Sequence, residues 1–221
     1  MSKVVSTYHQ RVAQEKRALI LAAASALFLE SGYDRTSLAR IAERSGVSRA
    51  TLFKQFPTKA ALFDVMVTES WSSGGEEDPP PTGDPAAGLG TLGHRYAALL
   101  GRPQMTDLFR IVIAELPRFP ELASAQFAHG KMPYFESVRA YLVAEHDAGT
   151  LRVEDAELAA TQFLGMISTY VFWPKLLVPG WEMSADRVTE VVQEAVRTTC
   201  ARYLADGTHP HPDRRARGRA R

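Results

Sequence analysis

Apolar residues recur at intervals of three and four along most of the 221-residue chain. This spacing places them on one face of a helix, and capping residues, glycines and prolines punctuate the pattern. The sequence therefore predicts an all-α fold. The expected helices cover about residues 11–31, 36–45, 48–56, 58–71, 89–100, 106–116, 120–128, 133–147, 155–177 and 184–205.

Two of these helices are short and closely spaced, as in a helix-turn-helix. Thr36 is a candidate N-cap for the first, and Gly46 stands where the chain must leave it with a positive φ. Ser48 can cap the second helix, in which Leu52 and Phe56 lie four residues apart and can pack inward. The connection of about three residues is typical of this motif.

The outward face of the second short helix is rich in hydrogen-bonding side chains. Arginine and glutamine can bind base edges in the major groove, threonine can present a methyl to thymine, and serine or lysine can hold a phosphate. Lys59 follows at a fresh helix start, where backbone N–H groups also favour a phosphate. The polar residues concerned are Ser48, Arg49, Thr51, Lys54 and Gln55. The alternative is a short solvated helix on a helical bundle.

The stretch from Ala18 to about Val67 resembles the DNA-binding domain of the TetR family of bacterial transcriptional regulators. The matching positions include Gly32-Tyr33, Ile41-Ala42 and Gly46-Val47-Ser48. This resemblance implies an N-terminal three-helix domain that binds a double-stranded DNA operator. With the residues above, it assigns DNA contacts to Thr36, Ser48, Arg49, Thr51, Phe53, Lys54, Gln55 and Lys59.

Two positions depart from the family pattern. Phe53 stands where a tyrosine is common, and Gln55 stands where a histidine is common. In the family each of those residues often contacts a phosphate. Phe53 has no hydroxyl with which to do so, whereas Gln55 retains an amide.

The charge distribution supports this organisation. Residues 1–60 carry a net charge of +6, residues 61–206 carry −9 and residues 207–221 carry +4. DNA should therefore approach the N-terminal end. We expect a DNA-binding domain over 1–57, a larger helical regulatory domain over 58–206 and a disordered basic tail over 207–221. Residues 72–88, rich in Gly, Pro and acidic side chains, are expected to form a loop.

The last two long helices, residues 155–177 and 184–205, carry more apolar residues than one neighbouring helix would cover. A protein with one recognition helix reads a full operator only as a pair. The resemblance also implies a homodimer built from these two helices as a four-helix bundle, with Val192 taken as central to the interface. Residues 109–165 resemble one C-terminal subgroup of the family.

The regulatory domain is expected to bind a small-molecule effector. Aromatic and methionine side chains are suited to an apolar pocket, although each is equally compatible with ordinary core. Because the candidates carry no charge, we expect an apolar or aromatic effector, with Tyr134 and Tyr170 able to make polar contacts. The candidates are Phe109, Phe127, Tyr134, Phe135, Phe163, Met166, Tyr170 and Trp173.

Other classes of protein find little support in the sequence. The motifs of a nucleophile elbow, a phosphate-binding loop or a dinucleotide site are missing, so we expect no enzyme and no cofactor. His209 and His211 alone are a poor metal site. No apolar run reaches the roughly 20 residues that span a bilayer, and we expect a cytoplasmic protein without membrane contact. An architectural DNA-binding protein without an effector remains the main alternative.

Overall fold

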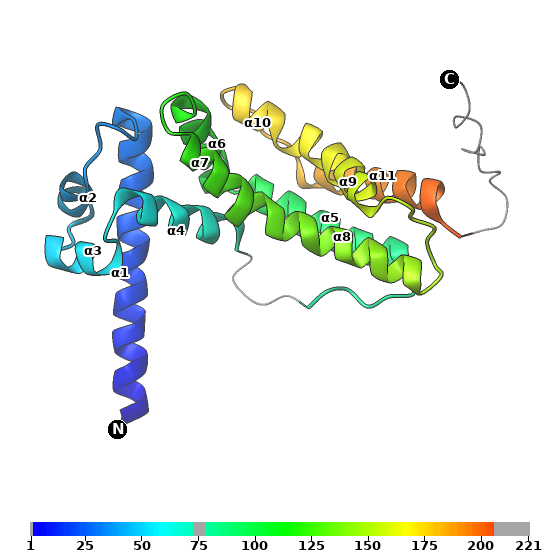
Figure 1. Cartoon of the computed structure of the whole chain (residues 1–221), viewed down its shortest axis with the longest axis horizontal. Helices are drawn as coiled ribbons and strands as arrows, with labels where there is room; N and C mark the ends of the chain where they lie inside the picture. The colour runs from blue at the N-terminus through cyan, green and yellow to red at the C-terminus, as the bar shows by residue number, and fades with distance from the viewer. Residues whose placement is uncertain (1, 73–77, 206–221) are drawn as a thin grey trace, which may run out of the picture.

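The structure is a computed structural model that describes residues 2–72 and 78–205, with side chains from residue 11 onward (Figure 1). Within these ranges the regular structure is helical, apart from one isolated antiparallel bridge between Leu151 and Leu204. The all-α prediction is confirmed. The helices are α1 Ser2–Ser31, α2 Leu38–Ser45, α3 Arg49–Gln55, α4 Lys59–Trp71, α5 Pro85–Gly101, α6 Pro103–Glu115, α7 Pro120–Ala125, the π-helix η1 Gln126–Lys131, α8 Met132–Asp147, α9 Ala156–Val171, α10 Trp173–Leu177 and α11 Ala185–Tyr203.

The helices are arranged in two groups joined by α4 (Figure 1). At one end, α1 and α2 pack together and α3 packs on α2. In the other group α5 lies against α9 and α11, and α8 packs on α9. Helix α6 packs on α1, which belongs to the first group, and also on the connecting helix α4. The second group therefore touches the N-terminal group directly through α6.

The expected helix over 155–177 is divided into α9 and α10. Phe172 separates them, with φ −111° and ψ −52°. Pro174 explains the division, because proline has no backbone N–H and its ring clashes with the carbonyl four residues earlier in a continuous helix. The prediction of one unbroken helix was wrong at this point.

Two further boundaries differ from expectation. The chain is already helical from Pro85, where Asp84 caps α5 through the N–H of Ala87, so the predicted loop was too long. The predicted break after residue 128 is instead the π-helix η1, which continues directly into α8. A π-helix of this kind is uncommon and often occurs at functional sites.

Val192, expected at the dimer interface, and Phe163, a candidate for the effector pocket, are both buried in the core of the single chain. Val192 has no exposed side-chain surface, so it packs inside its own protomer and is not free to meet a partner. Phe163 is equally buried.

None of the described helices is long and apolar enough to cross a membrane. The predicted basic tail lies outside the described residues.

Candidate functional site

The helix-turn-helix is held by local capping interactions. Ser37 caps α2, its hydroxyl accepting from the N–H of Arg40 at 3.2 Å. Gly46 ends α2 with φ +68°, as predicted. Ser48 caps α3, its hydroxyl accepting from the N–H of Thr51 at 3.2 Å, which confirms the predicted cap. Together these caps set the direction in which α3 leaves the turn.

Thr36 has a different position from the one predicted. It is not the cap of α2, and only 2% of its surface is exposed. Its hydroxyl donates to the carbonyl oxygens of Leu27 at 3.1 Å and Gly32 at 2.8 Å. The side chain therefore ties the end of α1 to the start of α2 and does not face solvent, which is a correction to its assignment as a DNA contact.

The exposed residues of α3 and its N-cap include Ser48, Arg49, Phe53 and Lys54. Arg49 and Lys54 make no hydrogen bond or ion pair with any residue that the structure describes. Phe53 is exposed over 47% of its surface. This face is thus open to a polyanion.

Two other candidates on α3 are half-buried. The hydroxyl of Thr51 lies 2.8 Å from that of Ser48, so its polar group is already engaged at the cap. Gln55 has its side-chain oxygen Oε1 buried without a hydrogen-bond partner among the described residues. Behind them Leu52 and Phe56 are buried, as predicted, and anchor α3 to the rest of the group.

The ammonium group of Lys59 is engaged within the protein. It donates to the carbonyl oxygens of Tyr33, at 2.5 Å, and Asp34, at 3.1 Å, and it lies 4.3 Å from the centre of the Tyr33 ring. Burial lowers the pKa of Lys59, while Asp34 and Glu115 act in the opposite direction. In this arrangement Lys59 holds the start of α4 against the turn after α1.

Tyr33 connects three parts of the molecule. Its ring packs on those of Phe28, Phe63 and Phe119, and its backbone N–H donates to the carboxylate of Glu115 at the end of α6. Burial raises the pKa of Tyr33 to about 12, with smaller contributions from Glu121 and Asp64. Glu115 is not among the residues predicted from the sequence, although it falls in register with the buried residues of α6.

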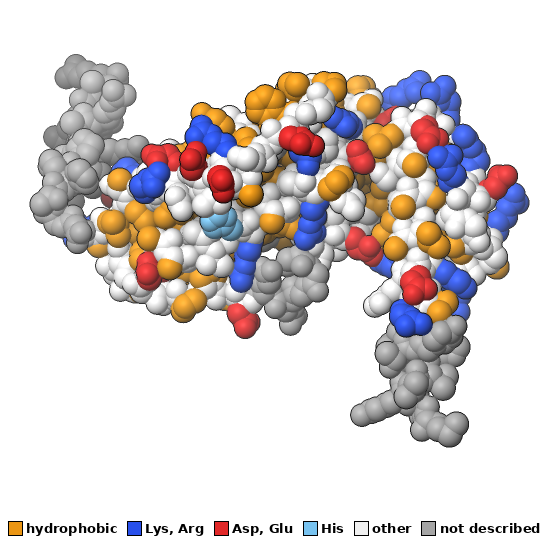
Figure 2. Space-filling view, turned by 180° about the vertical axis from the view of Figure 1, so that it is seen from behind, with side chains coloured by type: hydrophobic (Ala, Val, Ile, Leu, Met, Phe, Trp, Pro, Cys, Tyr) orange, Lys and Arg blue, Asp and Glu red, His pale blue; other side chains and the backbone are white. Residues whose placement is uncertain are grey.

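Basic side chains gather over the group that contains α1, α2 and α3, at the right of Figure 2. Arg40, Arg44, Arg49 and Lys54 are exposed on α2 and α3. Arg44 pairs with Glu30 at 2.9 Å, so part of this charge is neutralised. The remaining positive charge lies where the open face of α3 is presented.

The eight residues proposed for an effector pocket do not surround one cavity. Phe163 and Phe135 are buried, and Phe109 packs edge-on against Phe172 with ring centres 4.7 Å apart. Phe127 and Trp173 are about half exposed. Met166 and Tyr170 line a groove between α9 and α11, and Tyr134 lines a separate cleft. Neighbouring helices, rather than residue type, decide which side chains face a space.

The cleft has a volume of about 840 Å³ and lies among α4, α5, η1 and α8. Tyr134 closes part of it, with its hydroxyl donating to the carbonyl of Leu92 at 2.6 Å and its ring stacked on Tyr96. The lining also includes Trp71, Arg95 and His129, which the sequence analysis did not select. Two of these are basic, so the expectation of a wholly uncharged pocket does not describe this cleft.

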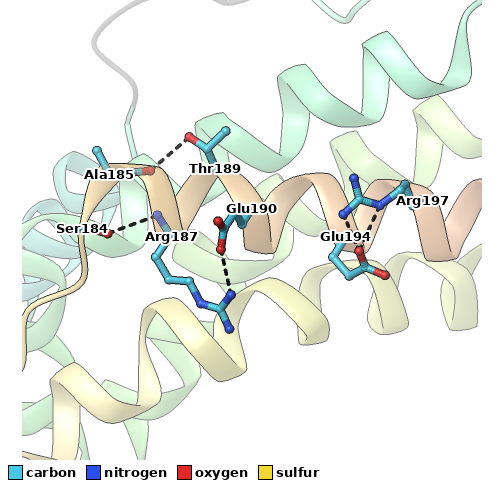
Figure 3. Close-up of polar contacts among 7 residues, drawn as sticks. All are labelled: Ser184, Ala185, Arg187, Thr189, Glu190, Glu194 and Arg197. Carbon is cyan, nitrogen blue, oxygen red and sulfur yellow. Dashed lines mark hydrogen bonds and ion pairs between the residues drawn. The ribbon is translucent and has the colours of Figure 1, made fainter.

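The groove between α9 and α11 has a volume of about 750 Å³, and Figure 3 shows the polar side chains of α11 that lie along it. Its floor is apolar, with Met166 and Val191, and its rim carries two ion pairs within α11. Arg187 contacts Glu190 at 2.8 Å, and Arg197 contacts Glu194. The described residues contain no group of three or more His, Cys, Asp or Glu side chains able to hold a metal ion.

Two family models match the chain. Residues 20–66 match the model of bacterial regulatory proteins of the tetR family. Residues 87–205 match the model of the C-terminal domain of AefR-like transcriptional repressors. The first covers the helix-turn-helix, and the second covers both helices of the groove and the part of the cleft that lies on α5, η1 and α8.

Individual relatives agree with these models. An uncharacterised HTH-type transcriptional regulator of Mycobacterium bovis is 27% identical over 189 residues, which is 85% of this chain and 91% of the relative. A solved TetR family regulator from Pseudomonas syringae is 28% identical with a TM-score of 0.74, covering 87% and 98% of the two chains. The solved flavonoid-responsive regulator FrrA is 26% identical with a TM-score of 0.67, over the same shares.

Proposed function

The chain belongs to the TetR family of transcriptional regulators, and from this we propose that it acts as a ligand-responsive repressor. It binds a palindromic operator as a homodimer and is released by a small aromatic or largely apolar effector. The observation that carries this proposal is the open face of α3. Arg49 and Lys54 are exposed there without internal partners among the described residues, on a helix anchored by buried Leu52 and Phe56.

The roles within α3 follow from side-chain chemistry. Arg49, in the first turn, can bind guanine O6 and N7 in the major groove. Lys54 supplies a point charge suited to a phosphate. Ser48 and Gln55 can add hydrogen bonds to the phosphate backbone of the DNA, whereas Phe53 offers only apolar contact. Thr36 and Lys59 contribute indirectly: Thr36 holds the turn before α2, and Lys59 holds the start of α4.

A homodimer is supported by the surface of α9 and α11. Two copies placed face to face would cover the apolar floor of the groove between these helices. Apolar side chains also gather along the upper edge of Figure 2, over α10. Trp173, Leu177 and Trp181 are exposed by 46%, 70% and 43% of their surface. Covering these residues removes apolar area from water, which favours association.

An effector is supported by the cleft among α4, α5, η1 and α8. Its volume of about 840 Å³ falls in the usual range for small-molecule sites, roughly 300–1,000 Å³. An architectural DNA-binding protein has no need of such a space. The similar regulator FrrA is described as flavonoid-responsive, which makes a flavonoid a sensible first compound to test.

The proposal is tested by selecting bound duplexes from a randomised DNA library. The enriched sequence should be an inverted repeat whose half-sites are centred about 10 bp apart or at a multiple of that spacing. Enrichment of a lone half-site, or of no sequence, would contradict the proposal that a homodimer binds a palindromic operator. Mobility shift with the selected duplex and naringenin, alongside a panel of neutral and anionic aromatic compounds, then tests release. If none of them changes the affinity, the architectural alternative is favoured.

A further inference from the structure

Phe53 lies on the same flank of α3 as Arg49. The two residues are four positions apart, a spacing at which side chains are neighbours on a helix. Leu52 and Phe56 are buried and set the rotation of α3, so this flank stays outside the core, and 47% of the Phe53 surface is exposed. Phe53 makes no ring-stacking or cation–π contact with any residue that the structure describes. Its ring is therefore available to DNA that approaches the open face of α3.

The neighbouring hydrogen-bonding groups of α3 are partly engaged within the protein. The hydroxyl of Thr51 lies 2.8 Å from that of Ser48, which also accepts from the N–H of Thr51. Oε1 of Gln55 is buried. Discrimination between bases therefore depends mainly on the two large side chains of the open flank, the guanidinium of Arg49 and the ring of Phe53.

The ring of Phe53 distinguishes base pairs by the groups that it covers. In the major groove, adenine, guanine and cytosine present hydrogen-bond donors or acceptors, and thymine alone also presents a methyl group, at C5. Covering a polar base edge with the ring removes water without supplying a hydrogen bond, which is unfavourable. Covering the thymine methyl group removes apolar surface from water, which is favourable. An apolar ring at this position thus favours thymine.

We propose that Phe53 selects a thymine in each operator half-site by contact with its 5-methyl group. This inference rests on the proposed operator binding and names a base that the half-site must contain. Four residues of a helix span about 6 Å, and successive bases of one strand are about 3.4 Å apart. The selected thymine therefore lies within about two base pairs of the guanine bound by Arg49. Because Phe53 has no hydroxyl, it acts on the base and not as a hydrogen-bond donor to a phosphate.

Replacing thymine by deoxyuridine tests the contact directly, because uracil differs from thymine only by the missing methyl group. The probe is the duplex selected from the randomised library, with each thymine of its half-sites replaced in turn. At one thymine we expect the full-length protein to lose affinity about fourfold for one half-site and about fifteenfold for both, as for one buried methyl group at each. 5-Methylcytosine at the same position should bind more tightly than cytosine by a similar factor. Fluorescence anisotropy at fixed salt measures these affinities.

Substitutions in α3 locate the methyl contact. Phe53→Ala should abolish the difference between thymine and uracil, whereas Phe53→Tyr keeps the ring and should retain it. Thr51→Ser is the matched control, because it removes the other methyl group of this face and keeps the hydroxyl that lies beside Ser48. Thr51→Ser should retain the difference, as should Arg152→Ala, which removes an exposed arginine outside the N-terminal group. Circular dichroism checks that each variant is folded.

Two results would overturn the inference. One is equal affinity for thymine and uracil at every position of the half-sites. The other is a difference that persists in Phe53→Ala, or that disappears in Thr51→Ser instead. Either result with an inverted repeat as the selected duplex would leave the proposed operator binding in place and remove the role of Phe53 alone. Enrichment of no sequence from the library would contradict both.

Discussion

Oε1 of Glu115, at the end of α6, accepts a hydrogen bond of 2.8 Å from the backbone N–H of Tyr33, just after α1. The bond is buried and joins residues 82 positions apart in the sequence. It connects α6 to the turn after α1. Lys59 binds the same turn, because its ammonium donates to the carbonyl oxygen of Tyr33. The bond therefore connects the end of α6 directly to the turn that precedes the helix-turn-helix.

Glu115→Ala should weaken this link. The N–H of Tyr33 would remain buried without an acceptor, which costs about 1–3 kcal/mol of unfolding free energy. Operator affinity should also change, because the turn between α1 and α2 loses a support. Urea unfolding and mobility shift measure the two effects. Glu182→Ala, at an exposed site, serves as the control, and equal behaviour of the two variants would show that the link is unimportant.

Removing the exposed cations of α3 should weaken DNA binding without loss of stability. We expect Arg49→Ala to lose about 1–3 kcal/mol of operator-binding free energy and to relax the sequence preference at one base pair, as for a base contact. Lys54→Ala should weaken binding to all DNA sequences by a similar factor and make the affinity less dependent on salt, as for a phosphate contact. Fluorescence anisotropy over a salt series distinguishes these patterns. Unaltered affinity in both variants, matching Arg152→Ala, would place the reading surface elsewhere.

The dimer proposal is tested at an exposed position of the groove. Tyr170 is 51% exposed on α9, and its ring lies 5.7 Å from the guanidinium of Arg187. Tyr170→Asp should give a folded monomer, because a charge would be buried against the partner. Val192→Asp should instead unfold the chain, since Val192 is wholly buried in its own protomer. Light scattering combined with circular dichroism separates the outcomes, and a dimeric Tyr170→Asp variant would exclude this interface.

Stability should depend on pH through Glu145, which is buried in α8. Burial alone would raise the pKa of its carboxyl, but hydrogen bonds from Thr150, Tyr141 and the N–H of Gly83 outweigh burial and lower it. The folded chain thus binds fewer protons than the unfolded chain near the ordinary pKa. The stabilisation is present at pH 7 and is lost as pH falls through the lowered value.

We expect Glu145→Gln to lose about 1–3 kcal/mol of unfolding free energy at pH 7, because the hydroxyl groups of Tyr141 and Thr150 lose a charged acceptor. The difference from the parent should shrink below about pH 4, where carboxyl groups become protonated. Urea unfolding at pH 7 and in acid measures this change. A deficit of the same size at both pH values would contradict a role for the ionised carboxylate.

The features that depend on neighbouring residues were predictable. Gly46 and Ser48 act through backbone geometry and a cap three residues away, and both predictions are confirmed. Thr36 and Ser37 show the limit of such reasoning. Both hydroxyl residues suit an N-cap, and only the packing of α1 beside α2 decides that Thr36 is buried while Ser37 caps.

The effector residues were less predictable, because a cavity depends on how distant helices meet. Tyr134 and Tyr170 look alike in sequence, yet one lines the cleft and the other lines the groove of α9 and α11. Glu115 did leave a signal. It follows Leu108, Ile111 and Val112 at helical spacing, so an acidic residue occupies the buried face of α6. A charge in that register indicates a specific partner.

The division of α3 into an anchored side and an open side has an evolutionary consequence. Leu52 and Phe56 are buried and fix the helix, while Arg49, Phe53 and Lys54 are exposed on its other side. Substitutions at the open positions can therefore accumulate without loss of the folded state. If the proposed reading face is correct, a duplicated gene could acquire a new operator by changing these few residues, and a designer could randomise the same positions while the rest of the fold is kept.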